Sequence, residues 1–195
     1  MGKCLFFRGP ARIGKSTVLR DKLNGEGLSI CGFTVQRVRE NEEIVGYQIT
    51  LIDRTELPAV ETETRERLTG MLISNRVFDI DPLIFTVKEL GERLKNGGHD
   101  VVLLDEIGGR ELENKEFMLK LMSILKQEIP CIGILKSKDN LMNSKINSRL
   151  GGLALAEYCN LERYILENGS ICDVLPDNVV EIQEQLDCFI SEAIM

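Results

Sequence analysis

Near its N-terminus the chain contains Gly9-Pro10-Ala11-Arg12-Ile13-Gly14-Lys15-Ser16-Thr17, which matches the phosphate-binding pattern G-x-x-x-x-G-K-[ST] at every fixed position. The apolar run Cys4-Leu5-Phe6-Phe7 precedes this stretch and predicts a strand, and a helical pattern follows it. Gly9 and Gly14 can adopt backbone angles closed to other residues, so the loop can turn its N–H groups inward around a phosphate. The start of the helix adds the positive end of its dipole. The stretch therefore predicts a phosphate-binding loop between a strand and a helix.

Several side chains of this loop have expected roles. The Lys15 ammonium should reach the β- and γ-phosphates of a bound nucleotide, and the Ser16 hydroxyl should bind Mg²⁺. Thr17 is placed for a further phosphate contact. Arg12 could stabilise charge on a transferring phosphoryl group, as an arginine finger does, or it could be a surface arginine. The expected nucleotide-binding residues are Gly9, Pro10, Ala11, Arg12, Ile13, Gly14, Lys15, Ser16 and Thr17.

A second motif lies in the middle of the chain, where the aliphatic run Val101-Val102-Leu103-Leu104 ends in Asp105-Glu106. A strand that delivers an acid at its end is typical of the metal site of phosphate-loop enzymes. We expect Asp105 to hold Mg²⁺ through water, opposite Ser16, so that Ser16 and Asp105 form the metal site. Glu106 can accept a proton from water and aim that water at the γ-phosphorus, which makes Glu106 and Lys15 the expected catalytic residues. The alternative is that both acids are only solvated at a strand end.

The order of elements predicts an α/β fold with a mainly parallel sheet, helices on both faces and one antiparallel hairpin, in a single domain over residues 1–195. The hairpin is expected from strands at 32–39 and 44–52. Within 53–75, the polar and acidic stretch 55–69 could be a mobile loop or a short strand pair. Other strands are expected at 3–8, 76–78, 101–104 and 131–135, with short strands, or one strand and a loop, at 164–166 and 171–174. Helices are expected at 14–23, 81–95 with Asp81 as the cap and Pro82 in the first turn, 114–127, 150–158 and 177–193.

Composition sets limits on partners and compartment. The 195 residues carry a net charge of -7, which disfavours non-specific nucleic-acid binding. Six cysteines without a C-x-x-C pair, and a single histidine, exclude zinc-type spacing. Because a signal peptide is not apparent and no apolar run is long enough to span a membrane, we expect a cytoplasmic protein with no membrane partner. No feature of the sequence argues for an oligomer, so a monomer is expected.

Three stretches together resemble the THEP1 family of phosphate-loop nucleoside-triphosphatases, also called cancer-related NTPases. They are the loop at 9–17, the hairpin Gly32-Phe33-Thr34-Val35-Gln36-Arg37-Val38-Arg39 with Val45-Gly46-Tyr47-Gln48-Ile49, and Leu103-Leu104-Asp105-Glu106-Ile107-Gly108-Gly109-Arg110-Glu111-Leu112-Glu113. The resemblance implies a RecA-like fold and slow Mg²⁺-dependent hydrolysis of ATP, GTP and other nucleoside triphosphates. It also implies Lys15 and Ser16 at the phosphates and metal, Asp105 at the metal, and Glu106 as base.

Two other functions remain open at this point: a phosphotransferase with a nucleotide or small-metabolite acceptor, and a nucleotide-dependent switch. A kinase of this size usually has an arginine-rich lid. The segment after Leu135 could be a cationic lid or a solvated face, and its basic residues are Lys136, Lys138, Lys145 and Arg149. We interpret Arg110 as a surface arginine and Glu111 as a cap of the following helix.

Overall fold

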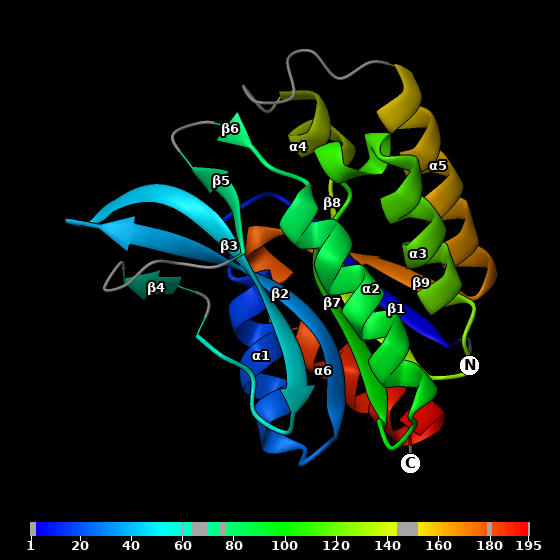
Figure 1. Cartoon of the computed structure of the whole chain (residues 1–195). Coiled ribbons are helices and arrows are strands. Elements are labelled where there is room, and N and C mark those ends of the chain that lie inside the picture. The colour runs from blue at the N-terminus through cyan, green and yellow to red at the C-terminus, as the bar shows by residue number, and fades with distance from the viewer. Residues whose placement is uncertain are drawn as a thin grey trace.

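A twisted mixed sheet forms the centre of the molecule in the computed structural model, with helices packed on both faces (Figure 1). The structure describes residues 3–59, 61–63, 70–74, 77–143, 152–178 and 181–194. Within these residues the strands follow the order β6-β5-β3-β2-β7-β8-β1-β9, and β4 pairs with β2 beside this path. The expected α/β fold is therefore confirmed.

Five neighbouring strands of the sheet are parallel. They are β2 (Ile30–Glu40), β7 (Val101–Ile107), β8 (Cys131–Lys136), β1 (Cys4–Gly9) and β9 (Gly169–Asp173), in that spatial order. Strand β8 lies between β1 and β7 and pairs in parallel with both. Because these strands run in the same direction, their carboxyl ends meet at one edge of the sheet, where ligands of such folds bind.

The other half of the sheet is antiparallel. Strand β3 (Glu43–Arg54) pairs with β2 along its length, which confirms the expected hairpin. Asn41 and Glu42 adopt positive φ angles of 48° and 67° at the turn. Strands β5 (Met71–Ser74) and β6 (Val77–Phe78) extend this half, and β4 (Glu61–Glu63) runs parallel to β2. The described residues of 55–69 thus contain one short strand, β4, which pairs with β2, and the rest of the expected strand pair lies outside the described residues.

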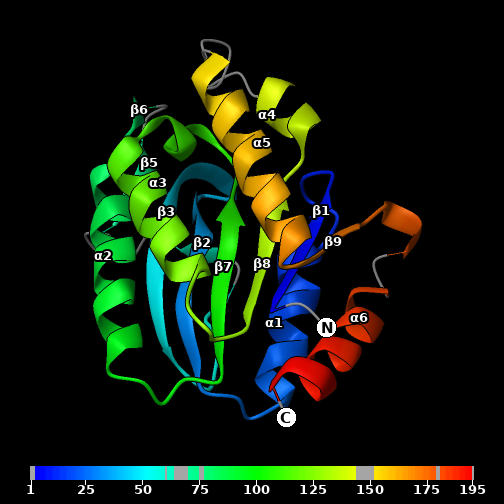
Figure 2. The same ribbon diagram turned by 90° about the vertical axis from the view of Figure 1, so that its right-hand side faces the viewer.

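Two hydrophobic layers hold the helices to the sheet. Helices α2 (Asp81–Lys95), α3 (Lys115–Leu125) and α5 (Gly152–Glu167) cover one face, and α1 (Lys15–Gly25) and α6 (Glu181–Phe189) cover the other (Figure 2). Alternate residues of β7 supply the two layers, with Val102 and Leu104 on one side and Val101 and Leu103 on the other. An uninterrupted aliphatic strand is buried on both faces, as its sequence predicts.

The ends of several helices differ from expectation. The run at 164–166 is not a strand but the last part of α5, because Tyr158, Leu161 and Ile165 recur at helical spacing and are all buried. The expected helix at 150–158 is correspondingly longer. Asp81 does not cap α2; the Asp79 carboxylate accepts a hydrogen bond from the Asp81 N–H at 3.0 Å. Residues 171–173 of the expected strand at 171–174 belong to β9, which ends at Asp173.

The C-terminal helix is also divided differently. A 3-10 turn, η2 (Pro176–Asn178), precedes α6, and a π-helical turn, η3 (Ile190–Ile194), follows it. The remaining short elements are η1 (Arg110–Glu113) and α4 (Lys138–Asn143). In the part of the chain that the structure describes, no helix is long and apolar enough to cross a membrane.

Candidate functional site

The phosphate-binding pattern forms a loop between the end of β1 and the start of α1. Gly14 precedes the helix with φ 95°, and Arg12 has φ 67° at the loop tip. A Cβ atom on Gly9 would lie 2.1 Å from the carbonyl oxygen of Val174, so only glycine fits the close approach of these two backbones. Pro10, Ala11, Arg12 and Thr17 are exposed along this loop and Ile13 is half-buried.

The Lys15 side chain folds back over the loop that it follows. Its ammonium donates hydrogen bonds to the carbonyl oxygens of Gly9, at 3.0 Å, and Pro10, at 2.6 Å, and the residue is only 6% exposed. Burial lowers the pKa of Lys15, while the nearby carboxylates of Glu106 and Asp105 oppose this effect. A cation that is partly desolvated and held at the loop is well placed to exchange carbonyl partners for phosphate oxygens.

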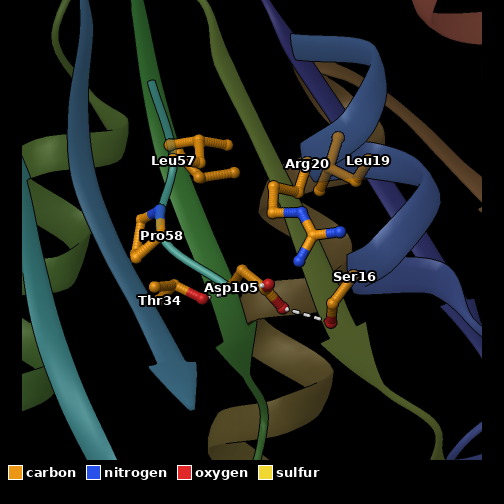
Figure 3. A pocket seen from close by; sticks show the side chains of 8 residues that line it. Ser16, Leu19, Arg20, Thr34, Leu57, Pro58 and Asp105 are labelled. Carbon is orange, nitrogen blue, oxygen red and sulfur yellow. Dashed lines mark hydrogen bonds between the residues drawn. The ribbon is translucent and has the colours of Figure 1, made fainter. Parts of the chain in front are cut away.

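Asp105 lies at the end of β7 and faces α1. One of its carboxylate oxygens accepts a hydrogen bond from the Ser16 hydroxyl at 3.0 Å, and the other accepts one from the Thr34 hydroxyl of β2 at 3.3 Å. Figure 3 shows the three side chains converging from α1, β7 and β2. Burial and the charge of Glu106 raise the pKa of Asp105 to about 7, against the two hydrogen bonds and Lys15, which lower it. A buried carboxylate is costly to ionise without a partner, so a cation bound here would stabilise the charged form of Asp105.

The oxygen atoms of Ser16 and Asp105 match the chemistry of Mg²⁺. This ion prefers hard oxygen ligands and usually keeps several waters, with one or two protein ligands and substrate phosphates. Within the described residues no group of three or more His, Cys, Asp and Glu side chains could hold a metal by itself. The residues present therefore fit an ion that is shared with a phosphate ligand.

A small cavity adjoins these residues between α1 and the segment that follows β3 (Figure 3). Its volume is about 10 Å³, which is room for roughly one water molecule and not for a nucleotide base. The lining residues are Ser16, Leu19, Arg20, Thr34, Leu57, Pro58, Leu103 and Asp105. This cavity therefore cannot itself hold a nucleotide.

Glu106 follows Asp105 through a cis peptide bond and is partly exposed. One of its carboxylate oxygens lies 3.5 Å from the ammonium of Lys136, at the end of β8. The structure thus brings Lys15, Ser16, Asp105 and Glu106 to one edge of the sheet. It adds Lys136 to the same edge, a residue that the sequence offered only as part of a lid or a solvated face.

Glu111 does not cap α3. Its carboxylate accepts the N–H groups of Gly108, at 2.8 Å, and Gly109, at 2.6 Å, and so fixes the turn after β7. The capping role belongs to Asn114, whose side chain accepts the Phe117 N–H at 3.0 Å. Glu111 lies within the turn that it binds, where a carboxylate can satisfy two backbone donors at once.

Two other basic candidates, Arg110 and Lys138, lie beside acidic side chains. Arg110 is exposed, 4.0 Å from Glu113 and over the ring of Phe78, in agreement with a surface arginine. Lys138 pairs with Glu162 at 2.6 Å. Lys145 and Arg149 lie outside the described residues, so a lid containing them stays a prediction.

Sequence reasoning missed Thr34 and Arg8. The Arg8 guanidinium donates to both carboxylate oxygens of Asp173, at 2.6 and 2.8 Å, and also binds Glu162. Thr34 pairs in register with Asp105, and Arg8 with Asp173, on neighbouring parallel strands. A polar residue within an apolar strand was only a weak sign that it binds another side chain. Its binding partner can be identified only when the order of the strands is known.

A loop with the phosphate-binding pattern follows β1, two carboxylates lie near the end of β7, and strand β8 lies between these two strands. This arrangement is that of a P-loop NTPase fold. A family model described as NTPase matches residues 4–165. The chain belongs to this NTPase family, and its enzyme class is that of the nucleoside-triphosphate phosphohydrolases.

Curated relatives agree with this assignment. The chain is 24% identical to the nucleoside-triphosphatase THEP1 of Caldivirga maquilingensis over 84% of this chain and 91% of the relative. It is 33% identical to the THEP1 of Ignicoccus hospitalis over 62% of this chain and 69% of the relative. The cancer-related nucleoside-triphosphatase homolog of Mus musculus is 25% identical over 64% and 70%. These matches confirm the THEP1 resemblance.

A solved structure supports the fold independently. The crystal structure of THEP1 from the hyperthermophile Aquifex aeolicus superposes with a TM-score of 0.57 at 16% identity, over 94% of this chain and 96% of that chain. The similarity of the two folds extends over nearly the whole of both chains.

Proposed function

We propose that this protein is a Mg²⁺-dependent nucleoside-triphosphatase that hydrolyses ATP, GTP and other nucleoside triphosphates to the diphosphate and phosphate. The proposal rests chiefly on one observation: the Ser16 hydroxyl and the Asp105 carboxylate, from the two separate motifs, lie 3.0 Å apart with Glu106 beside them. A metal-binding pair next to a second carboxylate is the arrangement that hydrolysis of a metal-bound phosphate requires.

The loop and Lys15 would bind the phosphates. The backbone N–H groups from Gly9 to Ser16 and the start of α1 supply donors and the positive end of the helix dipole. The Lys15 ammonium would leave the carbonyl oxygens of Gly9 and Pro10 and bind phosphate oxygens. This exchange replaces neutral acceptors with charged ones, which form stronger hydrogen bonds.

Ser16 and Asp105 would hold Mg²⁺. When bound, the ion neutralises charge on the β- and γ-phosphates. Hydrogen bonds from Ser16 and Thr34 hold the Asp105 carboxylate from both sides, so it would need little rearrangement to bind the metal or a water of the metal. The cation would also compensate the buried charge of Asp105.

Glu106 would act as the general base. Its carboxylate would accept a proton from a water molecule while the oxygen of that water bonds to the γ-phosphorus. The bond from the γ-phosphorus to the bridging oxygen breaks, and the diphosphate leaves with the bond's electron pair. Glu106 is suited to this role because it is adjacent to the metal-site residue and remains partly open to solvent.

The test is phosphate release from ATP, GTP, CTP and UTP, with Mg²⁺ and with the ion removed by a chelator. Mg²⁺-dependent release from several nucleotides is the expected result. Nucleotide binding without phosphate release would reject hydrolysis and favour the phosphotransferase or the switch, and a screen of phosphate acceptors would then separate these two.

A further inference from the structure

Lys136 occupies a structurally fixed point between the two motifs. It is the last residue of β8, and its backbone pairs in register with Gly9 on one side, while the preceding Leu135 pairs with Ile107 on the other. Its carbonyl oxygen accepts a hydrogen bond from the Tyr158 hydroxyl of α5 at 2.7 Å. The Lys136 side chain therefore starts from a backbone position that is held by two strands and a helix.

The side chain of Lys136 contacts the proposed base. Its ammonium is 3.5 Å from a carboxylate oxygen of Glu106, and the two side chains are only 30% and 36% exposed. A Cβ atom built on Gly109 would lie 3.3 Å from the same ammonium and 2.7 Å from an oxygen of Glu111. The ammonium thus lies beside the turn that Glu111 fixes and also beside the Glu106 carboxylate.

The charges around Lys136 keep it cationic. Burial lowers the pKa of Lys136, but the carboxylates of Glu106 and Glu111 outweigh this effect and raise the pKa overall. At neutral pH the side chain is therefore a fixed positive charge beside Glu106.

We propose that Lys136 is a positioning residue that holds the Glu106 carboxylate in the orientation in which it accepts the proton of the attacking water. This inference rests on the proposed role of Glu106. A glutamate side chain has several rotatable bonds, and a general base has to lie within hydrogen-bond reach of its water. A displacement of about 1 Å can cost about 100-fold in rate, so a fixed cation next to a partly exposed base has a direct effect on turnover.

A purely structural ion pair is the competing explanation, and Lys88 is the comparison for it. Lys88 on α2 carries the same charge and pairs with Glu116 on α3 at 2.7 Å, and the two side chains are 48% and 53% exposed. Exposed ion pairs of this kind contribute about 0–1 kcal/mol to stability. If Lys136 formed only a structural ion pair, its removal would resemble that of Lys88.

The experiment measures kcat and KM for Mg²⁺-ATP hydrolysis by the wild type, Lys136→Met, Lys136→Arg and Lys88→Met, with thermal melting of each. We expect Lys136→Met to lower kcat about 10- to 100-fold with KM within about threefold, because the base is displaced while the phosphate site is intact. Lys136→Arg, which keeps the charge, should recover part of kcat, and Lys88→Met should retain the wild-type value. An unchanged kcat in Lys136→Met, or a loss confined to KM, overturns the inference.

A double variant separates action through Glu106 from direct contact with substrate. In single-turnover reactions with excess enzyme, Lys136→Met combined with Glu106→Gln should be no slower than Glu106→Gln alone, within about twofold. A further loss of tenfold or more would show that Lys136 does not act through Glu106. Failure of the wild type to hydrolyse any nucleotide would instead reject the proposed function itself, so the two failures are distinguishable.

Discussion

The Ser16 hydroxyl on α1 lies 3.0 Å from a carboxylate oxygen of Asp105 on β7, although 89 residues separate them in the sequence. The contact joins the phosphate-binding loop to the second motif, and it depends on β8 lying between β1 and β7. Because the oxygens of both residues suit Mg²⁺, their proximity supports the proposed metal-dependent phosphate site.

Replacement of Asp105 tests this metal site. Asp105→Asn keeps the size of the side chain but removes its charge. We expect the Mg²⁺ concentration for half-maximal phosphate release to rise about tenfold or more. The reason is that hydrogen bonds and contacts to charged groups contribute about 1.5–3 kcal/mol. A Mg²⁺ titration of phosphate release measures this concentration. The control is Asp100→Asn, because Asp100 precedes the start of β7, at the end of the strand remote from the phosphate loop. An unchanged Mg²⁺ requirement would place the metal elsewhere.

Replacement of Lys15 tests the phosphate contact. Lys15→Ala removes the buried ammonium at the loop, and we expect the Kd for a nonhydrolysable nucleoside triphosphate to rise about 10- to 100-fold. Lys22→Ala removes a lysine of the same helix that pairs with Glu26 and Asp187, and it should leave the Kd unchanged. Calorimetric titration of both variants gives the comparison, and equal affinities would contradict the role of Lys15.

Gly9 is expected to be intolerant of any side chain. In Gly9→Ala the new methyl group meets the Val174 carbonyl oxygen at 2.1 Å, so β1 or the segment after β9 has to move. We expect a loss of about 2–3 kcal/mol in the free energy of unfolding, measured by urea denaturation. In Gly25→Ala nothing lies within 4 Å of the new methyl group, so this variant should be as stable as the wild type or more stable. Similar stability of both variants would contradict the close approach.

Glu111 is expected to stabilise the turn after β7. Glu111→Ala leaves the buried N–H groups of Gly108 and Gly109 without their acceptor, which should lower the free energy of unfolding by about 1–3 kcal/mol. Glu111→Gln retains one amide oxygen as acceptor and should lose less. Urea denaturation orders the three proteins, and a stability of Glu111→Ala equal to that of the wild type would show that the turn does not need this carboxylate.

The parts of the site that are contiguous in the chain could be predicted from the local sequence. The loop at 9–17 combines a fixed pattern with a preceding strand and a following helix, and the run at 101–104 is buried on both faces because every residue in it is apolar. These features need no knowledge of strand order. The same holds for the hairpin of β2 and β3, whose alternating residues and short turn are adjacent in the sequence.

Contacts between distant strands could not be predicted in the same way. Thr34 reaches Asp105, and Arg8 reaches Asp173, only because β2 lies beside β7 and β9 beside β1. Lys136 reaches Glu106 for the same reason, at the end of the strand next to β7. The error at 164–166 has a different cause: three adjacent apolar residues favoured a strand, whereas the buried residues of the longer segment follow helical spacing.

The most direct test of the central claim is Glu106→Gln, assayed for both nucleotide affinity and phosphate release with Mg²⁺. A glutamine keeps the shape of the side chain but cannot accept the proton, so we predict an unchanged Kd for ATP and a fall in kcat of about 100- to 10,000-fold. Hydrolysis at the wild-type rate would contradict the assignment of Glu106 as the base, and with it the mechanism derived from this site.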